Sequence, residues 1–109
     1  MASKKEYLDF ILEQLSGLDG IAWRAMMGEY ILYYNGKVFG GIYDDRFLVK
    51  PTPAAQAMLP NAPMELPYEG AKPMLLVENV EQPTFLAQLI TAMADELPMP
   101  RRRKIGGTL

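Results

Sequence analysis

The amino-acid sequence predicts an α+β domain, in which an antiparallel β-sheet (a central three-stranded meander plus short strands) is packed with two main α-helices and one short helix. The first observation is the segment of residues 30–50, where apolar and polar residues alternate around the pair Asn35-Gly36, the pattern of a β-hairpin. The second is two apolar stripes of helical spacing, one on each side of that segment. The third is the length of 109 residues, which suits one domain with a modest core.

The first expected helix spans residues 4–16. Ser3 is a suitable N-cap, and Glu6, three residues later, completes a capping box. Gly17 marks the end of the helix, because glycine readily terminates helical structure. The face expected to be buried carries apolar residues at helical spacing, namely Leu8, Ile11, Leu12 and Leu15.

A short strand is expected at residues 21–26, and a turn at residues 27–29 then leads into the meander. Arg24 in this strand has two interpretations. It forms a surface ion pair with Glu29 or an aspartate, or it presents a planar guanidinium group to an anionic partner. The sequence leaves both open.

The meander of residues 30–50 is expected to turn twice. Asn35-Gly36 suits a two-residue type I′ turn, in which both residues need a positive φ. A turn of this length fixes a register in which Leu32 opposes Phe39. A second tight turn is expected at Asp44-Asp45, with a three-residue loop as the alternative.

Side chains of a strand alternate between the two faces of its sheet, so this register assigns each residue of the meander to a face. The expected core face is almost wholly apolar and carries Ile31, Tyr33, Val38, Gly40, Ile42, Phe47 and Val49. The other face mixes aromatic rings with cations and carries Tyr30, Leu32, Tyr34, Phe39, Gly41, Tyr43, Arg46, Leu48 and Lys50. This second face is expected to be partly exposed or to meet a partner.

The pair Gly40-Gly41 lies inside an expected strand, where glycine often marks a bulge or a close backbone approach. The favoured interpretation places a helix against Gly40 and the Tyr30 ring over Gly41. A ligand approaching the backbone at this point is the alternative.

The second half of the chain is expected to form a short helix, a long loop, a strand and a final helix. Thr52 caps the short helix, Pro53 suits its first position, and the helix continues to residue 59. Residues 60–73 contain four prolines and form the loop, and residues 74–77 form the strand. The final helix begins near residue 83 and buries Leu86, Leu89, Ile90, Met93 and Leu97.

The long loop brings a ring, an acid and a base close together, at Tyr68, Glu69 and Lys72. A loop of this length in a compact domain is usually functional or packed as an Ω-loop. A self-capping turn and a recognition loop are both compatible with the sequence.

Composition limits the chemistry available to the chain. The absence of cysteine and histidine removes disulfides, thiolates, the usual general base and the commonest metal ligand. Ser3 and Ser16, the two serines, lie in or beside the first expected helix, so no catalytic residue, metal or cofactor is predicted. No apolar run approaches the roughly 18 residues of a membrane span, so a cytoplasmic location without a membrane partner is expected.

The net charge of −2 conceals an asymmetry. Residues 1–100 contain seven Lys or Arg and thirteen Asp or Glu, whereas four basic residues follow in one run. A folded domain is therefore expected at residues 1–97 and a basic, disordered tail at residues 98–109. The run that would neutralise about four phosphates of a nucleic acid is Arg101, Arg102, Arg103 and Lys104.

Three stretches resemble the N-terminal domain of the TfoX/Sxy family, the regulators of bacterial competence. They are residues 24–30 (RAMMGEY), 35–40 (NGKVFG) and 67–74 (PYEGAKPM), and the resemblance extends over about residues 4–97. Met27 stands where this family usually has phenylalanine, a substitution that preserves the apolar character. The resemblance implies a regulatory role.

The leading hypothesis is a non-enzymatic regulatory or adaptor domain that binds another protein, with a second copy of itself as one candidate. A nucleic-acid-associated regulator that uses the basic tail is the alternative, and a small-molecule-binding domain or enzyme comes after it. The candidate binding residues are Arg24, Met27, Gly28, Tyr30, Tyr34, Phe39, Tyr43, Lys50, Tyr68, Glu69 and Lys72.

Overall fold

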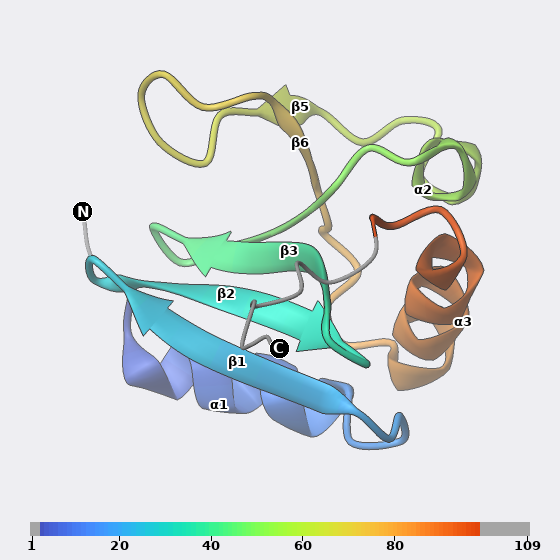
Figure 1. Cartoon of the computed structure of the whole chain (residues 1–109), viewed down its shortest axis with the longest axis horizontal. Coiled ribbons are helices and arrows are strands. Elements are labelled where there is room, and N and C mark those ends of the chain that lie inside the picture. Colours follow the sequence, from blue (N-terminus) through green and yellow to red (C-terminus); the bar gives the residue numbers. More distant parts are fainter. Residues whose placement is uncertain (1–2, 99–109) are drawn as a thin grey trace, which may run out of the picture.

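The framework of the protein is a six-stranded antiparallel sheet with the strand order β1-β2-β3-β4-β6-β5 (Figure 1). It is seen in a computed structural model that describes residues 3–98. The strands are β1 (Ile21–Met26), β2 (Glu29–Tyr34), β3 (Lys37–Tyr43), β4 (Arg46–Val49), β5 (Met64–Glu65) and β6 (Met74–Leu76). The predicted α+β class is confirmed.

Three two-residue turns join the first four strands into one meander. Asn35-Gly36 and Asp44-Asp45 have positive φ at both positions, as a type I′ turn requires. Met27-Gly28 forms a third turn of this kind between β1 and β2. The tight turn predicted at Asp44-Asp45 is thus confirmed, and the meander has one more strand than the sequence indicated.

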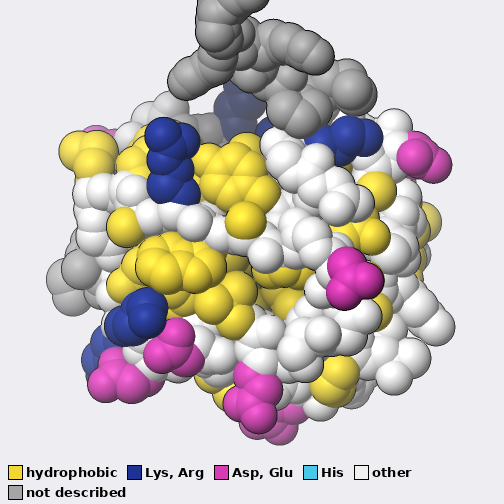
Figure 2. Space-filling model, turned by 60° about the horizontal axis from the view of Figure 1, so that its bottom comes forward, with side chains coloured by type: hydrophobic (Ala, Val, Ile, Leu, Met, Phe, Trp, Pro, Cys, Tyr) yellow, Lys and Arg dark blue, Asp and Glu magenta, His cyan; other side chains and the backbone are white. Residues whose placement is uncertain are grey.

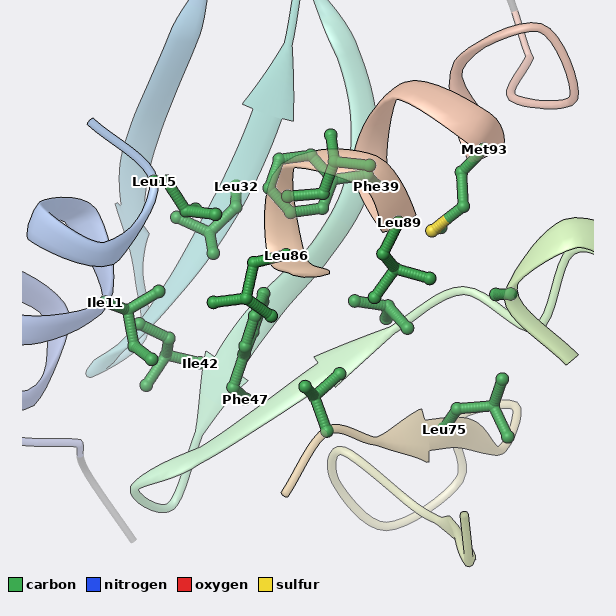
Figure 3. Close-up of a cluster of buried hydrophobic side chains, with 14 of the residues drawn as sticks. Ile11, Leu15, Leu32, Phe39, Ile42, Phe47, Leu75, Leu86, Leu89 and Met93 are labelled. Carbon is green, nitrogen blue, oxygen red and sulfur yellow. The ribbon is translucent and has the colours of Figure 1, made fainter. Parts of the chain in front are cut away.

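Helices α1 (Lys5–Gln14) and α3 (Pro83–Ala94) pack their apolar stripes against one face of the sheet, and α2 (Pro53–Met58) packs beside α3 (Figure 1). Figure 3 shows side chains of α1, α3 and the central strands pointing into one cluster. The Phe39 and Phe47 rings meet edge to face there, with centroids 6.4 Å apart. The fully buried members include Leu8, Ile11, Leu32, Phe39, Ile42, Phe47, Leu86, Leu89, Ile90 and Met93.

A β-bulge in β3 shows that part of the predicted register was wrong. Tyr33 pairs with Val38 as expected, but Leu32 then pairs with Gly40 instead of Phe39. The extra residue shifts the pairing by one position, and a shift of one moves side chains to the other face. Phe39 is consequently fully buried beneath the helices.

The bulge also corrects the two predicted faces. Tyr30 and Tyr34, assigned to the partly exposed face, pack against the helix-covered core. Ile31 and Tyr33, assigned to the core, pair with Arg24 and Ala22 on the opposite face. The face assignments of Gly40, Ile42, Phe47 and Val49 were correct, because these residues lie beyond the bulge.

The two glycines of β3 are explained by backbone and ring contacts. A Cβ atom at Gly40 would collide with the Leu48 carbonyl oxygen and lie 2.9 Å from the Val49 Cα. A Cβ atom at Gly41 would lie 2.6 Å from the Tyr30 carbonyl oxygen and from the Tyr43 ring. The prediction of the Tyr30 ring over Gly41 was therefore wrong, whereas that of a helix against Gly40 stays a prediction. The neighbouring strands and Tyr43 occupy that space.

Ser3 does not cap α1. The N-cap is Lys4, without a side-chain hydrogen bond, whereas the Ser3 hydroxyl donates to the Glu29 carboxylate at 2.6 Å and accepts from the Asp45 N–H at 3.0 Å. The start of the described chain is thereby tied to two turns of the meander. The predicted capping box was wrong because these longer-range partners use the Ser3 hydroxyl.

The later elements match the prediction closely. The Thr52 side chain accepts a hydrogen bond from the Ala55 N–H at 3.1 Å and caps α2. Strand β5 lies inside the segment of residues 60–73, which was expected to be wholly irregular.

The tail containing Arg101–Lys104 lies outside the described residues. Across residues 3–98, no helix has the length and apolarity needed to cross a membrane.

Candidate binding surface and loop cavity

The face of the sheet opposite the helices is mostly apolar over β1, β2 and the start of β3. Directly paired residues of antiparallel strands share a face, so Arg24 and Ile31 lie together, as do Ala22, Tyr33 and Val38. We call this the open face, and its residues are Ala22, Arg24, Met26, Ile31, Tyr33 and Val38. Each of them is exposed or half-buried.

Strand β1 is an edge of the sheet, and four of its six residues are exposed. Trp23 points to the helix side, where its ring packs edge to face with Tyr30 and the Lys5 ammonium lies 5.5 Å from its centroid, yet 40% of the residue remains exposed. Figure 2 brings this side of the molecule forward and shows hydrophobic side chains gathered at the surface beside basic and acidic ones. An edge strand of this kind offers unpaired backbone groups to another chain.

At the other end of the face opposite the helices, residues 66–73 fold over β3 and β4 and border a cavity of about 420 Å³ that is open to solvent on one side. We call it the loop cavity. Its walls come from four parts of the chain: the end of β3, the segment after β4, the loop, and the start of β6. The lining residues are Tyr43, Lys50, Pro51, Pro67, Tyr68, Ala71, Lys72, Pro73 and Met74.

Arg46 fixes the loop above the sheet. Its guanidinium donates to the Glu65 carboxylate at 2.8 Å, to the Pro67 carbonyl at 3.4 Å and to the Tyr43 carbonyl at 3.0 Å. The planar fork of arginine suits several acceptors at once. Within the loop, the Ala71 N–H donates to the Tyr68 carbonyl at 3.1 Å, and Gly70 supplies the positive φ of the turn.

Tyr43 forms the floor between sheet and loop. It is 6% exposed, its ring packs over Gly41, and its centroid lies 6.1 Å from that of Tyr68. Burial raises the pKa of the Tyr43 hydroxyl, and the neighbouring Tyr68, Glu29 and Tyr33 raise it further. The hydroxyl therefore keeps its proton at neutral pH and is a hydrogen-bond donor.

Four of the predicted binding residues meet in the loop cavity: Tyr43, Lys50, Tyr68 and Lys72. Glu69 is exposed on the same loop but does not line the cavity. The loop is thus a folded turn that also lines a cavity, and its role in recognition stays a prediction.

The other predicted residues are dispersed. Arg24 lies on the open face, and Met27 and Gly28 form an exposed turn. Tyr30, Tyr34 and Phe39 were wrongly grouped with Tyr43, because the bulge places them on the helix side. In the described part of the chain Arg24 forms no ion pair, so the predicted pairing with Glu29 or an aspartate was wrong.

Arg46 and Met74 were not among the predicted site residues, although Arg46 positions the loop and Met74 lines the cavity. Arg46 was assigned to the correct face, but nothing local indicated that it would hold a loop about twenty residues away.

No group of three or more potential metal-ligating side chains occurs among residues 3–98. The cavity offers two ammonium groups and two phenols, with no carboxylate in its lining.

These features define a small α+β domain with one face of its sheet packed under helices and the other bearing an open apolar surface and a loop cavity. The chain belongs to the TfoX N-terminal domain family, which matches residues 13–96. It therefore contains a domain of the kind found in competence regulators, as the sequence motifs indicated.

A second comparison gives a relative of nearly the same length. The chain is 36% identical over 106 residues to an uncharacterised 12.7 kDa protein in the trpE 5′ region of Spirochaeta aurantia, covering 95% of this chain and 91% of that protein. No solved structure matches the chain.

Proposed function

We propose that this chain is a non-enzymatic regulatory domain that acts by binding another protein through its open face. The proposal rests on the difference in burial between the two faces of the sheet. Helices bury the opposite face, whereas Ala22, Arg24 and Tyr33 on the open face remain exposed or half-buried. Membership of the TfoX N-terminal domain family supports the regulatory role.

The composition of this surface favours a protein partner. Trp, Tyr and Arg are enriched among the residues that carry most binding energy in protein interfaces. Arg24 and Tyr33 both lie on the open face, because Arg24 pairs with Ile31 and Tyr33 pairs with Ala22, whereas Trp23 is exposed on the helix side of the β1 edge. The free edge of β1 adds main-chain groups that a partner strand can pair with.

The proposal is tested by capture from native cell extract with the full chain as bait. Arg24→Glu and Tyr33→Ser alter the open face, whereas Lys4→Glu makes the same charge change as Arg24→Glu at an exposed position outside that face. We expect Arg24→Glu and Tyr33→Ser to lose a protein that the parent and Lys4→Glu both retain. Equal retention by all variants would contradict the proposal.

Two other kinds of partner, a nucleic acid and a second copy of this chain, are tested alongside. A bait that ends at residue 98 lacks the run Arg101–Lys104, and nuclease treatment removes nucleic acid from the extract. Recovery that requires the tail and disappears with nuclease would favour the nucleic-acid alternative, because phosphate contacts by Lys and Arg would then carry the binding. Light scattering over a range of concentrations tests a second copy of this chain as the partner.

A further inference from the structure

We propose that the loop cavity binds a small organic anion with a flat apolar body and one carboxylate or phosphate group. The cavity volume of about 420 Å³ lies within the roughly 300–1,000 Å³ typical of small-molecule sites. The proposal does not depend on the protein-binding role of the open face, because it uses different residues.

The charge of the cavity favours an anion. Lys50 and Lys72 both contribute to its walls, and no Asp or Glu does. Within residues 3–98 the ion pairs are Lys5–Asp9 and Arg46–Glu65, so neither cavity lysine is neutralised by a carboxylate there. This local positive charge occurs in a body where acidic residues outnumber basic ones. An anion between the two ammonium groups would relieve their mutual repulsion.

The hydroxyl of Tyr43 adds a donor that the described residues do not use. Tyr43 is 6% exposed, and its hydroxyl makes no hydrogen bond to any other group in the described part of the chain. Because Tyr43 lines the cavity, its hydroxyl is available to donate a hydrogen bond to a ligand oxygen there.

The remaining walls fit an apolar, flat body. Pro51, Pro67 and Pro73 have no backbone N–H and a restricted φ, so they form a stiff apolar frame, and Met74 adds an adaptable side chain. The ring of Tyr68 is 55% exposed beside this frame. An exposed aromatic face next to the cavity is a suitable surface for stacking a ring.

A purely structural role does not account for the lysines. The guanidinium of Arg46 and the Gly70 turn already hold the loop, whereas the Lys50 and Lys72 ammonium groups make no hydrogen bond or ion pair within residues 3–98. Replacing either lysine should therefore leave the fold intact. Ligand binding and folding can be separated experimentally for this reason.

The test is a titration of the full chain, followed by NMR through methyl-labelled methionines and tyrosine ring signals. The probe is phenyl phosphate, with benzoate as the carboxylate arm, inorganic phosphate to test the anion alone and benzyl alcohol to test the apolar body alone. We expect saturable shifts of the Met74, Tyr43 and Tyr68 signals with phenyl phosphate or benzoate. Because both parts of the ligand contribute, inorganic phosphate and benzyl alcohol should each bind about tenfold more weakly or worse.

The variants Lys50→Met and Lys72→Met should each weaken binding by roughly three- to tenfold, as expected for loss of one partly exposed charge-assisted contact. Lys4→Met is the matched control and should bind like the parent. Thermal unfolding of all three should be unchanged. The proposal is overturned if neither phenyl phosphate nor benzoate shifts the Met74 signal at millimolar concentration, or if both cavity variants bind these probes as tightly as the parent does.

Discussion

The two faces of the sheet are built from the same strands but contact different surroundings. On the helix side, Leu32, Ile42 and Phe47 are fully buried under α1 and α3. On the open face, Arg24 is exposed and Ile31, the neighbour of Leu32 in β2, is half-buried. The difference shows that the core uses the apolar side chains of only one face and leaves those of the open face partly accessible.

On the side of the sheet opposite the helices, the loop of residues 66–73 covers the end formed by β3 and β4. It does not extend over the open face. Where it folds over β3 and β4, the lining contains cations and phenols in addition to prolines. A loop needed only to shield apolar surface would have little use for two lysines without partners among the described residues. This face is thus divided between a cavity lined by cations and phenols at one end and a partly exposed, mostly apolar surface at the other.

The largest expected difference between the faces is in core packing. Phe47→Ala should lower the free energy of unfolding by about 3–5 kcal/mol, because it leaves a cavity in a dense core. Val38→Ala on the open face should cost about 1 kcal/mol or less, as for a half-buried site. Urea denaturation of both variants measures this, with Phe47→Leu as a milder substitute. Equal losses would show that the open face is as well packed as the helix side.

The β-bulge in β3, which decides the face on which Phe39 lies, is expected to tolerate no side chain at Gly40. Gly40→Ala should destabilise the fold by about 1–3 kcal/mol, because its Cβ meets backbone atoms of β4 that cannot move independently. Gly17→Ala is the control, since no atom lies within 4 Å of the Cβ position there. Thermal unfolding compares the two. A Gly40→Ala protein as stable as Gly17→Ala would mean that β3 can straighten.

The smallest expected effect is alkaline destabilisation, with one tyrosine contributing from each side of the sheet. Burial raises the pKa of Tyr7 on α1, with Asp45 adding to the effect, and burial also raises the pKa of Tyr43 under the loop. The unfolded chain then loses these protons first, so stability is complete below about pH 10 and falls as the pH rises through the folded-state pKa values.

Tyr7→Phe and Tyr43→Phe should each reduce the loss of stability above pH 10, and the double variant should reduce it further. Denaturant unfolding at several pH values between neutral and strongly alkaline measures this slope. A slope that is unchanged in Tyr43→Phe would show that the hydroxyl under the loop is as accessible to water in the folded state as in the unfolded chain.

Local signals made much of the fold predictable. Asn35-Gly36, Thr52-Pro53 and the stripe of the last helix each specify an element through neighbouring residues. The bulge was not predictable, because Gly40-Gly41 is compatible with a straight strand, a close approach or a bulge. This one ambiguity reversed the faces of Tyr30, Tyr34 and Phe39.

The candidate site was less predictable than the fold. Tyr43, Lys50, Tyr68 and Lys72 were individually suggestive, but their convergence depends on where an irregular loop lies, and a loop has no periodicity from which this can be inferred. The Arg46 contacts that position the loop join groups far apart in sequence. Only the three-dimensional arrangement shows that a turn and a cavity share these residues.

The three two-residue turns also have a consequence for the order of folding. Because of these turns, every pairing within β1–β4 joins two strands that are consecutive in the chain. Pairing of consecutive strands closes only a short loop, at low entropic cost. The pairing of β4 with β6 and the docking of α3 join much more distant segments. We therefore expect the meander to form early and the loop cavity to be among the last parts of the molecule to assemble.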